Sequence, residues 1–430
     1  MKKKVYVCLA ADILHEGHIN ILKRASKLGD VIVGLMTDNA ISKYKKIPFL
    51  NYKQREVVIK NLHMVKKVIP QTTMDYRENL KLIKPNFVVH GDDWKKGILK
   101  KNRDQVISEL KKWSGKLIEY PYTKNISSSS IKENIINSPL FNISRVSMLR
   151  RLLETKGFVR IIEAHSPLAG LIIENTKLQK HKNDKEYDGM WSSSLTESLM
   201  RGKPDNQSVE LSTRITALNE LLDVTTKPVV FDADNGGRIE HMSYKINSLE
   251  RQGVSAIVLE DKIGLKKNSL FKNQKNAQQD SIKNFCKKLK VAAKSKNSKD
   301  FLIVARIESF ILGKGLQDAL RRAKAYSNSG ADAILIHSKQ NNPKEIFKFS
   351  KIYKKFKNRK FLVAVPSSYS KTLEKDLINN GFNLVIYANH MLRASYLSMN
   401  KLALDILKNS RSFESEKQIS KISDLLKYST

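Results

Sequence analysis

Eight short apolar runs between positions 159 and 387 constrain the fold of this chain more than any other feature. Most are rich in aliphatic residues, and a segment long enough for a helix separates each run from the next. Continuous apolar runs are typical of parallel strands that are buried on both faces. Eight such units predict an (α/β)8 barrel of the triosephosphate-isomerase type, with strands at 159–162, 187–191, 228–231, 256–259, 302–305, 333–336, 362–365 and 384–387.

Polar or ionisable residues follow nearly all of these runs. In a parallel barrel the carboxyl ends of the strands meet at one rim, where barrel enzymes have their active sites. Functionless polar loop residues are the alternative, but they would not place carboxylates, Arg and His so consistently at one end. We therefore expect one site built from Glu163, His165, Ser192, Ser193, Asp232, Asp234, Glu260, Asp261, Arg306, His337, Ser367, Asn389 and His390.

The first 140 residues have a different rhythm. Apolar runs at 5–9, 31–36, 87–90 and 116–119 alternate with helical patterns at 19–28 and 54–62. This alternation predicts a parallel sheet flanked by helices, a Rossmann-like α/β domain. Since 430 residues exceed what one core normally serves, we predict two domains, 1–140 and 146–430.

The net charge and the cysteine content indicate which binding partners and which cellular compartment to expect. The net charge of +36 suggests nucleic acid as one partner, but the lysines are dispersed and no nucleic-acid-binding module is recognisable. We expect a lysine bias and anionic substrates rather than an RNA-binding protein built on an inactive barrel. The two cysteines, Cys8 and Cys286, lack metal or redox spacing, which favours the cytoplasm. Asp12 and His15 interrupt the apolar start too early for a signal peptide, and no stretch predicts a membrane span.

Three carboxylates suggest a metal site in the barrel. Asp232 and Asp234 are two residues apart, so on a strand they project to the same side. Glu260 follows the next strand, and a cluster of hard oxygen ligands suits Mg2+. A helix-capping role is the alternative for this Asp-x-Asp pair. Gly236 and Gly237 then permit close approach of the backbone to a phosphate or carboxylate.

The segment 260–270, with the sequence EDKIGLKKNSL, has the composition of a mobile lid. A strand-end carboxylate leads into a loop with a glycine hinge, Gly264, and with cations and amides suited to cover an anionic reactant.

This string resembles the signature of the phosphoenolpyruvate mutase family, within the isocitrate lyase superfamily. The similarity extends over about 150–400 and includes EAH, WSSSL, RGKPD, DADNGG, ARIES and YANH, at 163–165, 191–195, 201–205, 232–237, 305–309 and 387–390. It implies an isomerase that interconverts phosphoenolpyruvate and 3-phosphonopyruvate with Mg2+, forming the carbon–phosphorus bond of phosphonate biosynthesis.

The resemblance also implies roles for the matching residues. Asp205 corresponds to a carboxylate that accepts the phosphoryl group or stabilises it as metaphosphate; a helix N-cap is the alternative. The other roles are substrate binding by Arg306 and His337, lid closure by Lys266 and Asn268, pocket lining by Trp191, Ser193, Leu195 and Ser269, and magnesium binding by Asp232, Asp234 and Glu260.

Two groups of relatives give alternative activities. Isocitrate and methylisocitrate lyases use a cysteine in the corresponding lid, and 263–267 contains none, so we do not expect lyase activity. Phosphonopyruvate hydrolase is a closer alternative, because small changes in a lid can admit water. The retained Lys266, Asn268 and Ser269 favour the mutase.

The N-terminal domain carries a second set of motifs. His15-Glu16-Gly17-His18 opens a helix and resembles the HxGH motif of nucleotidyltransferases, in which two histidines stabilise developing phosphate charge. The GDDW sequence at 91–94 resembles glycerol-phosphate-type cytidylyltransferases, which implies CTP. The resemblance assigns nucleotide binding to Gly17, Lys43, Lys46, Gly91, Asp92, Trp94, Thr123, Ser127 and Ser128.

Two departures from that family weaken the N-terminal assignment. Tyr122 replaces an arginine near the phosphates, and Asn125 replaces a glycine. We expect transfer of CMP from CTP to a phosphonate such as 2-aminoethylphosphonate. The alternative is a nucleotide-binding domain that regulates the barrel without catalysis. By resemblance we also expect a homodimer or homotetramer that exchanges C-terminal helices around 397–407.

Overall fold

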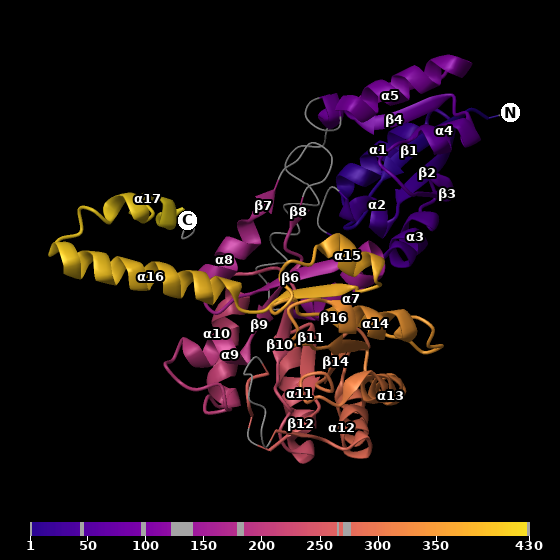
Figure 1. Cartoon of the computed structure of the whole chain (residues 1–430). Coiled ribbons are helices and arrows are strands. Elements are labelled where there is room, and N and C mark those ends of the chain that lie inside the picture. The colour runs from indigo at the N-terminus through magenta and orange to yellow at the C-terminus, as the bar shows by residue number, and fades with distance from the viewer. Residues whose placement is uncertain are drawn as a thin grey trace. The chain divides into compact units, whose positions relative to one another are not determined.

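The chain divides into two compact units, Met1–Phe141 and Asn142–Thr430 (Figure 1). The computed structural model describes residues 2–43, 47–95, 100–121, 141–178, 185–264, 266–269 and 277–427, without the side chains of 93 and 141–143. Each unit has its own hydrophobic core.

The first unit is a five-stranded parallel sheet with helices, as predicted. Its strands, in the spatial order β3-β2-β1-β4-β5, are β1 Lys4–Leu9, β2 Asp30–Met36, β3 Val65–Gln71, β4 Phe87–Gly91 and β5 Lys116–Tyr120. Its helices are α1 Glu16–Ser26, α2 Asp38–Ser42, α3 Tyr52–Lys60, α4 Arg77–Ile83 and α5 Lys100–Leu110, with short 3-10 turns η1 Asp92–Lys95 and η3 Lys111–Trp113.

Strand β3 was not among the predicted strands. It lies at the edge of the sheet and pairs only with β2 among the described residues. Lys66 and Lys67 are exposed and Pro70 lacks an N–H, and these features suit an edge strand but break the apolar pattern.

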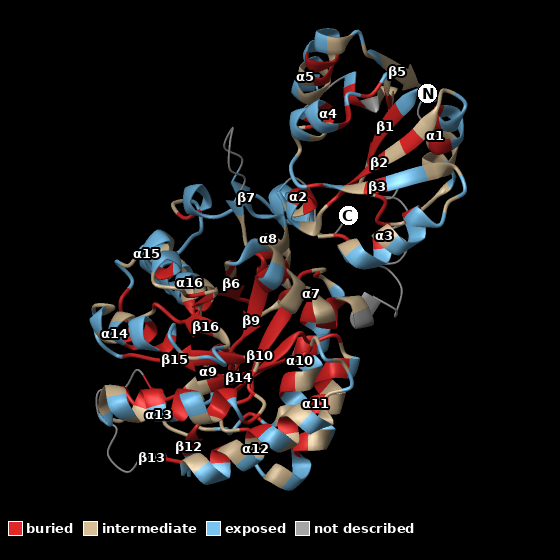
Figure 2. Cartoon of the chain, turned by 90° about the vertical axis from the view of Figure 1, so that its right-hand side faces the viewer, coloured by how far each residue is buried: buried red, intermediate tan, exposed pale blue. Residues whose placement is uncertain are grey.

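The second unit is a closed barrel of eight parallel strands, and all eight predicted strands are confirmed. The strands are β6 Val159–Glu163, β9 Gly189–Ser192, β10 Val229–Asp232, β11 Ala256–Glu260, β14 Leu302–Ile307, β15 Ala333–Ile336, β16 Phe361–Ala364 and β17 Leu384–Tyr387. Figure 2 shows that buried residues concentrate in these strands.

The helices of this unit are α7 Phe141–Lys156, α8 Pro167–Asn175, α9 Ser194–Leu199, α10 Leu211–Asp223, α11 Met242–Arg251, α12 Ile282–Ser295, α13 Gly315–Ser327, α14 Lys344–Tyr353, α15 Glu374–Asn379, α16 His390–Asn409 and α17 Ile422–Leu426, with η4 Ile239–His241 and η5 Glu416–Gln418. In α16 and α17 only Leu392 is buried, and both helices extend away from the barrel strands (Figure 1). Two antiparallel pairs complete the unit: β7 Lys177–Leu178 with β8 Lys185–Glu186, and β12 Lys262–Ile263 with β13 Gln278–Gln279.

No helix in the described part of the chain is both long and apolar enough to span a membrane.

Candidate active site

A pocket lies at the carboxyl ends of the barrel strands, where the sequence predicts it. Eleven of the twelve barrel residues to which the resemblance gave a role line it, and Asp234 is the exception. Of the strand-end residues expected there without a role, Ser367 and Asn389 also line the pocket, whereas Glu163, His165, Ser192, Asp261 and His390 do not. The eleven are Trp191, Ser193, Leu195, Asp205, Asp232, Glu260, Lys266, Asn268, Ser269, Arg306 and His337.

Asp205 is held on both carboxylate oxygens by the loop that follows β11. Lys266 Nζ donates to Oδ1 at 2.5 Å, and Asn268 Nδ2 donates to Oδ2 at 2.7 Å. The capping alternative does not hold, because the next helix, α10, begins only at Leu211. Both Asp205 and Lys266 have nearly buried side chains. The loop therefore reaches the pocket and orients its carboxylate.

Lys266 is the cationic centre of the acidic side of the pocket. Its Nζ also lies 2.6 Å from Asp234 Oδ1 and donates to Ser194 Oγ at 2.5 Å. Burial acts to lower the pKa of the ammonium, but the charges of the surrounding carboxylates outweigh burial and raise that pKa. Lys266 is consequently a permanent positive charge beside the pocket.

Asp232 and Glu260 end the neighbouring strands β10 and β11 and are both buried. Burial acts to raise the pKa of Asp232, but the charges of Lys266, Arg306 and Arg214 lower it overall. Burial raises the pKa of Glu260 to about 7, although Arg306 lies 3.6 Å away. One carboxylate is thus stabilised as an anion while the other is poorly solvated.

The expected cluster of three metal-binding carboxylates is absent from the described residues. Strand β10 ends at Asp232, and Asp234 has a left-handed backbone with φ of 53°. The rule that residues two apart share a side applies within a strand, so it does not extend to Asp234. Asp234 instead pairs with Lys266 at 2.6 Å and lies 3.8 Å from Arg214.

Asp232 and Glu260 nevertheless fit a magnesium ion. Mg2+ in enzymes commonly takes only one or two protein carboxylates and fills its remaining positions with water and substrate oxygens. These two carboxylates border the pocket from adjacent strands.

Arg306 and His337 form the basic side of the pocket. Arg306 is the last residue but one of β14, His337 directly follows β15, and Arg306 Nη2 lies 3.0 Å from His337 Nδ1. Arg306 is also the register partner of Glu260 across β11 and β14. Burial lowers the pKa of His337, so its ring is neutral near pH 7. The arrangement can bind a small anion between Arg306 and the carboxylate side.

Several residues of the site were not assigned roles from the sequence. Ser367 and Asn389 line the pocket, and their buried side-chain oxygens have no hydrogen-bond partner within the described ranges. Arg214 supports the acidic side by donating to Glu197 Oε2 at 2.8 Å and to the backbone oxygen of Asp232 at 2.6 Å. Arg214 lies in the first turn of α10 and belongs to no motif, so nothing in its local sequence marks this role.

The first unit places its histidine motif at the reversal of strand order. The order changes direction between β1 and β4, and ligands of open α/β sheets bind outside the carboxyl ends of such strands. His15 and His18 follow β1, and Gly91 and Asp92 end and follow β4. The two predicted motifs therefore come from the two strands that flank this point.

The histidines are fixed at the start of α1. His15 Nδ1 accepts from Gly17 N at 3.2 Å, and His18 Nδ1 accepts from His15 N at 3.4 Å. Because each Nδ1 accepts a backbone N–H, the proton of each neutral ring lies on Nε2. Partial burial lowers the pKa of His15. Both rings can thus present an N–H donor to a phosphate.

The other residues predicted to bind nucleotide differ in their exposure. Lys43 is exposed at the end of α2. Trp94 is buried, stacks on His90 at 3.8 Å between ring centroids, and donates its indole N–H to Glu119, so it supports the turn from inside. The remaining predicted positions, and the two departures from the motif, lie outside the described residues: Lys46, Thr123, Ser127, Ser128, Tyr122 and Asn125.

Arg55 binds chain segments before and after Lys43, a role the sequence did not reveal. Its side chain is fully buried and donates to Ala10 O at 2.5 Å, Leu50 O at 3.1 Å and Asp38 Oδ1 at 2.5 Å. It therefore joins Ala10, directly after β1, to the first residue of α2 and to Leu50, two residues before α3.

The second unit is thus an α/β-barrel enzyme domain with an acidic and a basic side to one pocket. A family model described as phosphoenolpyruvate phosphomutase matches residues 149–407, and the chain belongs to this family. A cytidylyltransferase-like model matches residues 10–134. The two resemblances expected from the motifs are confirmed.

Individual relatives agree with both assignments. The chain is 32% identical over 295 residues to the phosphoenolpyruvate phosphomutase of Tetrahymena pyriformis, covering 68% of this chain and 94% of that one. It is 32% identical over 136 residues to the glycerol-3-phosphate cytidylyltransferase of Bacillus subtilis, covering 31% and 97%. A solved phosphonopyruvate hydrolase in complex with oxalate and Mg2+ is similar with a TM-score of 0.59 and 28% identity, covering 66% and 94%.

Proposed function

We propose that the barrel interconverts phosphoenolpyruvate and 3-phosphonopyruvate. The observation that carries this proposal is the contact of Lys266 and Asn268 with the two oxygens of Asp205. During its transfer between oxygen and carbon, a phosphoryl group needs charge stabilisation and exclusion of water. A carboxylate held by a cationic loop over a pocket supplies both.

The rearrangement needs no net proton or electron transfer. The P–O bond of phosphoenolpyruvate breaks and leaves its electron pair on the enolate. Carbon three of the enolate then forms the P–C bond, and the enolate oxygen becomes a carbonyl. Asp205 either accepts the phosphoryl group or stabilises it, Lys266 balances its charge, and Arg306 holds the anionic pyruvyl part.

We propose Mg2+ as the cofactor, held by Asp232 and Glu260 with Asp234 acting through Lys266. When bound, the ion neutralises these carboxylates and the negative charge of the substrate. The donor set and the magnesium in the similar hydrolase support this assignment.

Phosphorus NMR of the purified protein with phosphonopyruvate and Mg2+ tests the barrel assignment. We expect phosphoenolpyruvate to form. Inorganic phosphate and pyruvate without phosphoenolpyruvate would favour the alternative, a phosphonopyruvate hydrolase, to which the chain is also similar.

We further propose that the first unit transfers CMP from CTP to a phosphonate such as 2-aminoethylphosphonate. The position of His15 and His18 at the β1–β4 reversal supports nucleotide binding. Because the same chain also carries the barrel that we propose to form a phosphonate, we favour a phosphonate as the acceptor of CMP.

Pyrophosphate release with CTP and a panel of acceptors tests this second activity. Release only with glycerol 3-phosphate or phosphocholine would overturn the phosphonate acceptor. His18→Ala should abolish release while the mutase activity stays intact. Nucleotide binding without release in the parent protein would favour the regulatory alternative.

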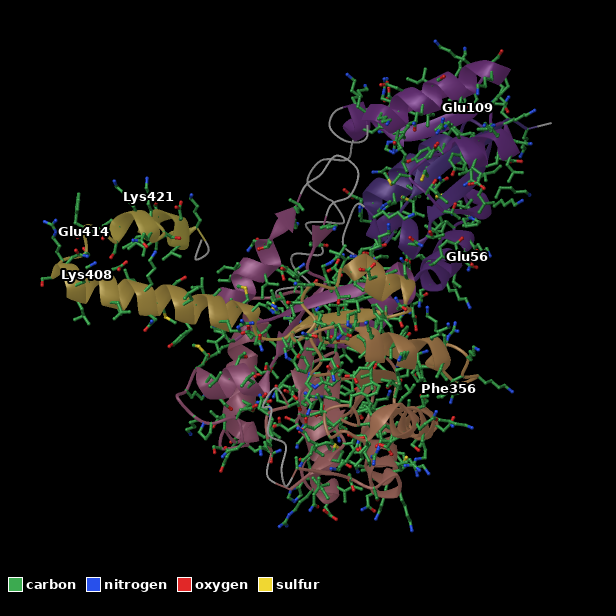
Figure 3. All side chains as sticks on the ribbon, in the orientation of Figure 1. Glu56, Glu109, Phe356, Lys408, Glu414 and Lys421 are labelled. Atoms are coloured by element: carbon green, nitrogen blue, oxygen red, sulfur yellow. The ribbon has the colours of Figure 1, made fainter. Side chains whose placement is uncertain are left out.

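We also propose a homo-oligomer in the cytoplasm. Figure 3 shows the C-terminal helical segment that carries Lys408, Glu414 and Lys421. Large apolar side chains are exposed along it, among them Tyr396, Leu397, Met399, Leu404, Leu407, Phe413, Ile422 and Leu426. Exposed apolar surface of this kind marks an interaction site.

The two cysteines are unpaired, which suits a reducing compartment such as the cytoplasm.

A further inference from the structure

Glu308 connects three parts of the barrel site, although it does not line the pocket. It directly follows β14 and is fully buried. Its Oε1 accepts from Arg306 Nε at 2.6 Å and lies 3.2 Å from His337 Nδ1. Its Oε2 accepts from Ser269 Oγ at 2.6 Å. One carboxylate therefore contacts both residues of the basic side and the loop that covers the pocket.

The Glu308 carboxylate fixes the orientation of Arg306. A fully buried charge is stable only when it is paired and hydrogen-bonded, and Arg306 and Lys262 provide the positive charges, with Lys262 Nζ 3.4 Å away. Because the Nε of Arg306 is bound to Glu308, its Nη2 lies 2.9 Å from Ser269 Oγ and 3.0 Å from His337 Nδ1.

Ser269 is fixed by the same group. Its hydroxyl donates to Glu308 and accepts from Lys262 Nζ and Arg306 Nη2, both at 2.9 Å. A hydroxyl has one proton and two lone pairs, so these three bonds saturate it. The preceding residue is Asn268, which contacts Asp205. The position of the loop over the reacting group thus depends on the orientation of the basic side.

We propose that Glu308 is a positioning residue that sets whether the phosphoryl group is transferred between carbon three and the enolate oxygen of the pyruvyl part or is captured by water. This inference rests on the proposed mutase function. In the capture branch the P–C bond breaks with its electron pair on the enolate. A P–O bond forms to water, water loses a proton, and carbon three gains one to give pyruvate. Loosening Ser269 admits water, and rotating Arg306 misplaces the enolate.

The experiment compares Glu308→Gln, Ser269→Ala and the control Glu250→Gln in the full-length protein. Glu250 is also buried, but it binds the backbone N–H groups of Asn297 and Ser298 away from the pocket. Phosphorus NMR measures the ratio of phosphate to phosphoenolpyruvate formed from phosphonopyruvate. We expect this ratio to rise about tenfold in the first two variants, from loss of a charged hydrogen bond, and to stay unchanged in the control.

The product ratio does not depend on the fraction of folded protein, so a merely structural role would not change it. Parental ratios in both Glu308→Gln and Ser269→Ala would overturn the inference. Should the parent protein form no phosphoenolpyruvate, the proposed function fails, and calorimetry with oxalate and Mg2+ then tests Glu308 by itself. About tenfold weaker oxalate binding in Glu308→Gln than in Glu250→Gln supports positioning; equal binding refutes it.

Discussion

Replacement of Asn268 by alanine tests whether the loop acts directly on the reacting group. The substitution removes the 2.7 Å bond from Nδ2 to Asp205 and leaves Lys266 in place. A hydrogen bond to a charged group contributes about 1.5–3 kcal/mol. At about 1.4 kcal/mol per tenfold change in rate, kcat should fall by about 10- to 150-fold.

The assay couples phosphoenolpyruvate formation from phosphonopyruvate to pyruvate kinase and lactate dehydrogenase. Asn268 is only partly buried on a loop, so the melting temperature should change little. Asn342→Ala, on an exposed loop after β15, is the matched control and should keep parental kcat. A kcat within twofold of the parent for Asn268→Ala would refute the direct role of the loop.

Three further outcomes are expected. Asp232→Asn should raise the Mg2+ concentration needed for half-maximal turnover more than about tenfold, and an unchanged requirement would exclude this ligand. The Arg103 hydrogen bond lowers the pKa of Glu119 to about 2. The stabilisation that ionised Glu119 gives the folded protein is therefore complete above about pH 4.5 and lost as the pH falls toward 2. In urea unfolding, Glu119→Gln should have a lower free energy of unfolding than the parent protein at pH 7 and an equal one near pH 2. Leu404 and Leu407 are 58% and 79% exposed, so Leu→Glu at both should lower the mass measured by light scattering.

The barrel and the outline of its site were predictable from the sequence for a physical reason. Strands buried on both faces must be apolar along their length, and a polar residue is tolerated only where a strand reaches the rim. Runs such as Ala256–Glu260 therefore reveal both the strand and the residue that enters the pocket. Asp205 was found only through its motif, since it lies in a loop with no periodicity.

Features that depend on neighbours in space were decided by the tertiary structure alone. Asp234 turns toward Lys266 because β10 ends at Asp232, and strand ends are set by pairing with adjacent strands rather than by local sequence. The edge strand β3 exists because β2 offers it a partner, despite its lysines and proline.

Glu308 and Arg214 illustrate the same limit at the level of function. Each is a charged residue that is buried and has partners far away in the chain: Arg214 pairs with Glu197, 17 positions away, and Glu308, besides its neighbour Arg306, binds Ser269, 39 positions away. A sequence shows which side chains can ionise, but the partners that make burial tolerable come together only when the barrel closes.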